Sequence, residues 1–139
     1  MIDISHIKDC IEDSLFQLIL HVDDNKDTLI IKSLQELKSC FSPQEEIIEF
    51  ALNECDLLPI LEDCLTPGSK HSFRNISIFS LSVDILYIVH NYCFDDLYYR
   101  NLVDKIVHIY TILSKANNVE LGRVKTLQLK WRFPTEHEA

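Results

Sequence analysis

The longest apolar run of the chain, Ile76 to Phe94 (ISIFSLSVDILYIVHNYCF), constrains the fold more than any other stretch. Its hydrophobic residues cover nearly the whole circumference of a helix, and Asp84 is its only formal charge. Such a helix has to be enclosed by neighbouring helices or by lipid. The run is nearly long enough to cross a bilayer, but its three serines, Asp84, His90 and Asn91 are costly in hydrocarbon. We therefore expect a central helix over residues 73–93, covered on most sides by flanking helices, and no membrane association.

Composition favours an all-α chain. Only two glycines and four prolines occur among 139 residues, which leaves few turns and favours long helices over many short strands. The hydrophobic fraction of 47% is ordinary for a globular protein, and the length suits one domain with a sizeable core. We expect a single helical domain over residues 1–133 and a loose C-terminal tail over residues 134–139.

Apolar residues at spacings of three and four predict further helices along the chain. The expected ranges are about 4–22, 28–40, 43–52, 56–65, 96–103, 104–113 and 119–131. The aspartate-rich turn over residues 23–27 should cap the second helix, and Ser42-Pro43-Gln44-Glu45 reads as a capping box with Pro43 at the first helical position. Asp95 or Asp96 should cap one short helix after the central one, and Asp104 the next.

The net charge of −9 is unevenly distributed. Residues 1–66 hold 15 acidic and four basic side chains, a net charge of −11, whereas residues 67–139 hold seven acidic and nine basic ones, a net charge of +2. The acidic half repels phosphate backbones and argues against nucleic-acid binding by the whole domain. It either steers a basic partner to the N-terminal half or is simply a solvated face.

The pattern of cysteines and histidines predicts neither disulfides nor a metal site. The five cysteines are odd in number, form no C-x-x-C, and mostly fall on apolar helix stripes, where a free thiol behaves as a small hydrophobe. This pattern favours an intracellular compartment, cytoplasm or nucleus. His90 and Cys93 lie one helical turn apart, but two ligands do not make a metal site. Because phosphate-binding loops and catalytic serine motifs are also missing from the sequence, we expect no enzyme activity, cofactor or small-molecule substrate.

Two segments of the sequence resemble each other, which indicates an internal repeat. Leu34–Cys40 (LQELKSC) has a counterpart in Leu86–Cys93 (LYIVHNYC), and each is followed by an expected short helix and then an apolar helix. Glu54–Leu61 (ECDLLPIL) looks like the stretch E-x-G-x-(I/L)-P-x-L of the armadillo family of helical repeats, of which HEAT repeats are a near relative. Leu86–Cys93 looks like the family's L-x-x-L-x-N-L-x, with Asn91 at the asparagine position.

The match to the armadillo pattern is degenerate and covers about residues 28–117. Asp56 stands where the family has glycine, and Ser39 stands where the first unit should have asparagine. The two leucines that open the similar segments are 52 residues apart, more than one armadillo unit. The resemblance implies a short right-handed α-α superhelix of about two repeats with partial units at both ends. An unrelated helical bundle is the alternative.

If the resemblance holds, a partner helix or extended peptide would lie along the surface of the helix that bears Asn91. The neighbours of this residue on comparable faces are Lys38, Ser39, Tyr87 and His90. Asn91 could instead be a helix-end residue that bonds a nearby carbonyl. Asp84 either pairs with a serine, a tyrosine hydroxyl or Arg100, or meets a partner protein.

The expected last helix is basic and apolar at once. Its side chains include Arg123, Lys125 and the aromatic anchor Trp131, and they favour docking onto the domain or onto a partner. Its apolar side would leave an end of a short array uncovered, so we expect a protein partner or self-association. That apolar side consists of Val119, Val124, Leu127, Leu129 and Trp131. The sequence thus predicts a non-enzymatic protein-interaction module or scaffold subunit, with a nucleic-acid adaptor acting through residues 115–132 as the alternative.

Overall fold

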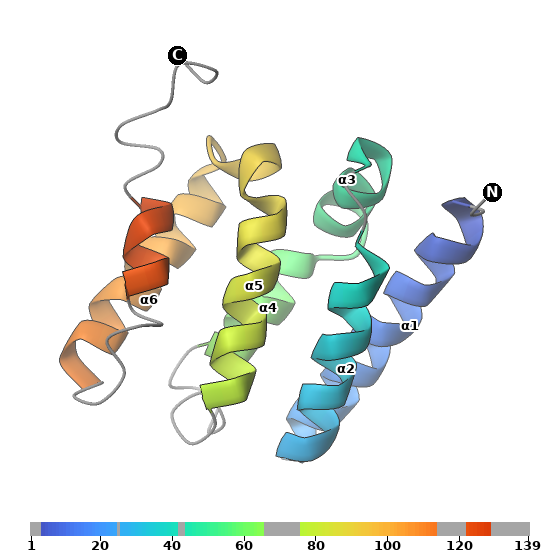
Figure 1. The fold of residues 1–139 in the computed structure, drawn as a ribbon, viewed down its shortest axis with the longest axis horizontal. Coiled ribbons are helices and arrows are strands. Elements are labelled where there is room, and N and C mark those ends of the chain that lie inside the picture. Colours follow the sequence, from blue (N-terminus) through green and yellow to red (C-terminus); the bar gives the residue numbers. More distant parts are fainter. Residues whose placement is uncertain (1–3, 25, 42–43, 66–75, 114–121, 129–139) are drawn as a thin grey trace. The chain divides into compact units, whose positions relative to one another are not determined.

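The computed structural model describes residues 4–24, 26–41, 44–65, 76–113 and 122–128 (Figure 1). Over these ranges the chain forms helices and turns and no strand, which confirms the all-α prediction. The chain divides into two compact units, Met1–Tyr92 and Cys93–Ala139, and each is described by itself. The expected tail, residues 134–139, lies outside the described residues, and the predicted extent of the domain over residues 1–133 stays a prediction.

Five helices make up the first unit: α1 (Ile4–Asp23), α2 (Asp27–Cys40), α3 (Glu45–Asn53), α4 (Leu57–Leu65) and α5 (Ile76–Cys93). Helix α1 packs most extensively on α2 and also contacts α3 and α4, which contact each other. Helices α1 and α2 are antiparallel because the turn between them is short, whereas α2 and α5 run in the same direction (Figure 1). Their shared core consists of fully or almost fully buried aliphatic side chains, among them Ile11, Leu18, Ile30, Leu34, Leu37, Ile47, Leu57, Leu61 and Val83.

Helix α5 is buried on one face rather than on most sides, which differs from the sequence-based expectation. Its buried face includes Phe79, Val83 and Leu86. The opposite face, which includes Leu81, Tyr87 and Ile88, is only half-buried. The same face also carries the polar side chains of Asp84 and Asn91. Enclosing these groups would be costly, which is a chemical reason for the exposure. In the described part of the chain, no helix is long and apolar enough to traverse a bilayer.

The starts of α2 and α3 differ from the expected caps. The N-cap of α2 is Lys26, which offers no side-chain acceptor, so the aspartate turn does not supply the expected cap. Helix α3 begins at Glu45 because Gln44 has an extended backbone (φ −106°, ψ 123°) and its carbonyl accepts the first helical bonds, from the amides of Ile47 and Ile48. The predicted start at Pro43 is therefore wrong, and Ser42 and Pro43 lie outside the described residues.

A three-residue turn joins α3 to α4. The amide of Glu54 donates to the Phe50 carbonyl and closes α3, and the Asp56 carbonyl accepts from the amide of Ile60 in the first turn of α4. Asp56 has a φ of 54°, in the left-handed region that favours glycine. The sequence comparison with the armadillo stretch places Asp56 at the glycine of that pattern, and its observed φ is one that a glycine adopts without strain.

The second unit contains α6 (Leu97–Leu113) and a helical segment over residues 122–128. Asp96 caps α6, since its Oδ1 accepts from the amides of Tyr98 at 2.7 Å and Tyr99 at 3.3 Å. The prediction of two separate helices here is wrong. Helix α6 runs through Asp104, because no glycine or proline interrupts its backbone hydrogen bonds. Asp104 instead accepts from Nε2 of Gln128 at 2.6 Å and links α6 to the following segment.

Candidate functional site

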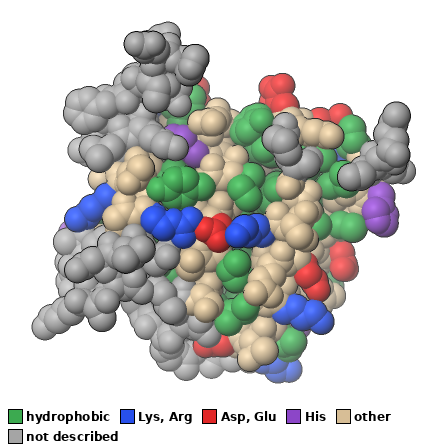
Figure 2. Space-filling view, in the orientation of Figure 1, with side chains coloured by type: hydrophobic (Ala, Val, Ile, Leu, Met, Phe, Trp, Pro, Cys, Tyr) green, Lys and Arg blue, Asp and Glu red, His purple; other side chains and the backbone are tan. Residues whose placement is uncertain are grey.

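Several residues that the sequence predicted as partner-binding lie on one surface, formed by α2 and α5 and called here the α2–α5 face. We define this face by half-buried or exposed residues that share one side of each helix: Ile31, Gln35, Lys38, Ser39, Leu81, Asp84, Tyr87, Ile88 and Asn91. Over α2 and α5, Figure 2 shows mainly hydrophobic and uncharged side chains, with a few charged groups among them.

An ion pair joins the two helices within this face. Lys38 Nζ, in the last turn of α2, lies 2.9 Å from Asp84 Oδ2 at the middle of α5. The two side chains are 43% and 23% exposed, so the pair is partly desolvated but still reached by water. The sequence suggested a serine, a tyrosine hydroxyl or Arg100 as partners of Asp84. The sequence did not predict Lys38 as a partner, because Lys38 is 46 residues away from Asp84 and only the packing of α2 beside α5 brings the two together.

Exposed polar groups flank this ion pair. Asn91 is exposed and lies one turn beyond Tyr87, which is half-buried. Ser39 is exposed next to Lys38, and its hydroxyl donates to the Glu36 carbonyl at 2.7 Å within its own helix. The α2–α5 face therefore combines amide and hydroxyl groups with the half-exposed apolar side chains of Leu81 and Ile88.

His90 does not belong to the α2–α5 face. It is only 1% exposed, which removes it from the surface where the sequence expected it. Cys93, one turn further, is also buried. Burial raises the pKa of the Cys93 thiol to about 12, with smaller contributions from the carboxylates of Asp96 and Asp95. Within the described ranges, no three or more side chains of the kinds that ligate metals come together.

The basic residues near the C-terminus belong to the second unit. Arg123 is half-buried and Lys125 is exposed, on the helical segment over residues 122–128. Val124 and Leu127 of the same segment are fully buried, so they do not contribute to an uncovered apolar end. Trp131 lies outside the described residues, as do Val119 and Leu129, so the anchoring role of Trp131 stays a prediction. The nucleic-acid adaptor also stays a prediction.

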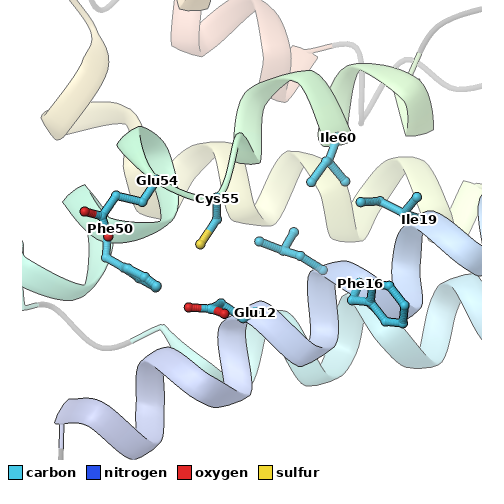
Figure 3. A pocket seen from close by; sticks show the side chains of 8 residues that line it. Glu12, Phe16, Ile19, Phe50, Glu54, Cys55 and Ile60 are labelled. Carbon is cyan, nitrogen blue, oxygen red and sulfur yellow. The ribbon is translucent and has the colours of Figure 1, made fainter.

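A groove that the sequence did not predict runs along α1, opposite the turn between α3 and α4 (Figure 3). It has a volume of about 390 Å³ and is lined by Glu12, Leu15, Phe16, Ile19, Phe50, Glu54, Cys55 and Ile60. In Figure 3 the thiol of Cys55 points from the turn toward α1, and Ile60 and Ile19 approach each other from opposite walls. We call this depression the α1 groove.

The α1 groove has an acidic end. Burial, together with the nearby carboxylates of Glu12, Glu54 and Asp56, raises the pKa of Cys55 to about 11, because both effects disfavour the thiolate. The sequence held a signal for this groove, since Phe16, Ile19 and Leu20 fall outside the apolar stripe that predicts α1. Side chains of that size outside the stripe indicate apolar surface left over after the core has formed.

No protein-family model, curated protein sequence or solved structure matches this chain. The α2–α5 face and the α1 groove both combine apolar side chains with a few polar or charged ones, a combination that suits non-covalent recognition of another chain. Four cysteines, Cys40, Cys55, Cys64 and Cys93, have raised pKa values, so they are poor thiolate nucleophiles near neutral pH.

Proposed function

We propose that this chain is a non-enzymatic protein-interaction module whose α2–α5 face binds an extended segment of a partner protein. One observation carries the proposal: helix α5 is apolar nearly all round, yet its neighbours bury only one side of it. Leu81, Tyr87 and Ile88 consequently stay half-exposed beside α2. A partner that covered them would remove apolar area from water, at about 25 cal/mol for each Å².

An armadillo-like arrangement is part of this proposal, and two features of the first unit support it. Helices α2 and α5 bear the two similar segments of the sequence, run in the same direction (Figure 1) and are joined by the ion pair between Lys38 and Asp84. The left-handed Asp56 lies where the family's stretch has glycine. The continuous α6 departs from a three-helix unit and resembles the two-helix unit of HEAT repeats more closely.

The polar groups of the face are suited to an extended backbone. An extended peptide brings unpaired N–H and C=O groups that need partners when they are desolvated. The amide of Asn91 can donate to a carbonyl and accept from an N–H group at once, and the exposed hydroxyl of Ser39 can accept a further bond. Tyr87 lies between the ion pair and Asn91 along α5 and offers its ring to an apolar side chain of the peptide.

The proposal is tested by quantitative affinity capture from cell extracts with the full-length chain. Two variants are compared, Asn91→Ala and the double variant Asn91→Ala with Tyr87→Ala. Each should reduce the recovery of the principal partner about tenfold, the effect of losing roughly 1.4 kcal/mol of binding free energy. Glu49→Ala, a change at an exposed position of α3, is the matched control and should leave recovery unchanged. Urea unfolding of each variant separates loss of binding from loss of fold.

If Asn91→Ala and the double variant recover every partner as well as the wild type, while folding as stably, the α2–α5 face is not the binding surface. If Asn91→Ala alone changes nothing but the double variant does, apolar contact with Tyr87 is sufficient and the backbone-bonding role of Asn91 is refuted.

A further inference from the structure

Helix α1 presents more apolar surface than the rest of the first unit covers. Its inner side chains Ile11 and Leu18 are fully buried against neighbouring helices. On its outer side Phe16 is 58% exposed, Ile19 43% and Leu20 42%. Phe16 and Ile19 are one turn apart and line the α1 groove. A smaller depression continues along the same helix between Ile19, Val22, Ile60 and Asp63.

Two carboxylates at the end of the groove form no ion pair in the described part of the chain, although Lys8 lines a depression next to one of them, Glu54. These are Glu12 on α1 and Glu54 after α3, which both line the groove. The surrounding chain is also acidic, since residues 1–66 carry a net charge of −11. A positively charged ligand would therefore be attracted to this end of the groove.

The structure already places one cation beside the groove. Lys8 Nζ lies 3.1 Å from Glu46 Oε1 and 5.2 Å from the centre of the Phe50 ring. Phe50 lines the α1 groove as well as the adjoining depression that contains Lys8. An aromatic face and one carboxylate thus hold an ammonium group at one end of this surface, and the neighbouring Glu12 and Glu54 repeat the acidic part of that environment.

We propose that the α1 groove binds a basic amphipathic helix of a partner protein. Its apolar side chains would lie between Phe16, Ile19 and Ile60, and its lysines or arginines would reach Glu12 and Glu54. The groove and its continuation follow α1 from Glu12 to Val22, about 15 Å at 1.5 Å per residue, which matches roughly three turns of a docked helix. This site is separate from the α2–α5 face and does not depend on the function proposed for that face.

A helix suits this groove better than an extended segment does. The groove walls are mainly apolar side chains, and a helix already satisfies its own backbone hydrogen bonds. An extended segment would bury backbone N–H and C=O groups against Phe16 and Ile60 without partners. Lysine and arginine stems can also lie along the apolar rim while their charged ends reach the carboxylates.

The test uses synthetic probes of 14 residues, each labelled with fluorescein. The first peptide carries leucines on one helical face and lysines elsewhere, the second replaces the lysines with glutamates, and the third scrambles the order of the first. Fluorescence anisotropy with the full-length chain at low salt should detect binding of the first peptide at least about tenfold tighter than either control, since only the first matches both apolar face and charge.

Variants of the chain then locate the site. Phe16→Ser should weaken binding of the first peptide about tenfold, and Glu12→Gln with Glu54→Gln about three- to tenfold, because each rim charge contributes modestly. Matched controls are Glu36→Gln, an exposed charge on α2, and Leu97→Ser, an exposed leucine of the second unit. Neither control should change the affinity, and unfolding curves confirm that every variant is folded.

A second measurement places the peptide directly at the groove. Alkylation of Cys55 by iodoacetamide, resolved by mass spectrometry, should slow at least about threefold when the first peptide is bound, since Cys55 faces the groove (Figure 3). Equal affinities for the lysine and glutamate peptides, unchanged binding by Phe16→Ser, or no protection of Cys55 would each overturn the proposal. Sedimentation that shows a dimer abolished by Phe16→Ser would also overturn it, because a second copy of the chain would then occupy the groove.

Discussion

The left-handed conformation of Asp56 makes a prediction about stability whose sign can be tested. Asp56 has a φ of 54° and is exposed, so substitutions there change backbone preference while leaving the core intact. An L-residue in this region is less stable by roughly 1–2 kcal/mol, and a short polar side chain such as that of aspartate can offset part of this through local hydrogen bonds. Alanine offers no such offset, and a β-branched residue such as valine fits least well.

From the most to the least stable protein, the expected order of residues at position 56 is glycine, aspartate, alanine, valine. Glycine avoids the left-handed penalty but loses about 0.5–1 kcal/mol through its greater freedom in the unfolded chain. Asp56→Gly should therefore be more stable than Asp56→Ala by about 0.5–1 kcal/mol, and Asp56→Val should be the least stable by about 2 kcal/mol. A difference of 1 kcal/mol corresponds to about 2–4 °C in Tm for a chain of this size.

The measurement is urea and thermal unfolding of the four proteins, followed by circular dichroism at the helical band. Glu54, two residues earlier, is a matched control because its backbone is right-handed (φ −107°, ψ −24°). There the order should reverse, with Glu54→Ala more stable than Glu54→Gly by about 0.5–1 kcal/mol. If Asp56→Ala equals or exceeds Asp56→Gly, residue 56 is not left-handed in solution, and its correspondence to the armadillo glycine fails.

Two further predictions concern the ion pair and the buried thiols. Lys38→Met should lower the free energy of unfolding by about 1 kcal/mol, because it leaves the partly buried Asp84 without this cation. Combining Lys38→Met with Asp84→Leu should restore most of the lost stability. Additive losses in this double-mutant cycle would contradict the pairing. Burial, with smaller contributions from nearby aspartates, raises the pKa of Cys64 and Cys93 from 9.0 to about 12, so the neutral thiols favour the folded state. This contribution to stability is fully present below pH 9 and is lost as the pH rises toward 12, so the urea midpoint should fall above pH 9. The double variant Cys64→Ala with Cys93→Ala should show a smaller fall. An equal fall in the wild type and the double variant would refute the role of these two thiols.

The two surfaces differ in how far the sequence predicted them. Asn91, Tyr87 and Lys38 were predicted as neighbours on comparable faces, because residues three and four apart lie on the same side of a helix. His90 has almost the same position in the helical pattern but is buried. Spacing gives the direction of a side chain from its own helix, whereas burial depends on which neighbouring helix lies in that direction, and periodicity does not contain this information.

The sequence by itself determined that the chain is helical and where most helices lie. These properties follow from periodicity, from the scarcity of glycine and proline, and from local preferences that act within one turn. It also predicted left-over apolar surface, but placed it on the last helix, where Val124 and Leu127 are buried. Only the tertiary structure decided that α5 is covered on one side, that Lys38 reaches Asp84 across 46 residues, and that Phe16 and Ile19 face the turn at Cys55. Each of these depends on contacts between helices distant in sequence, where small differences in packing decide which of several apolar faces is buried.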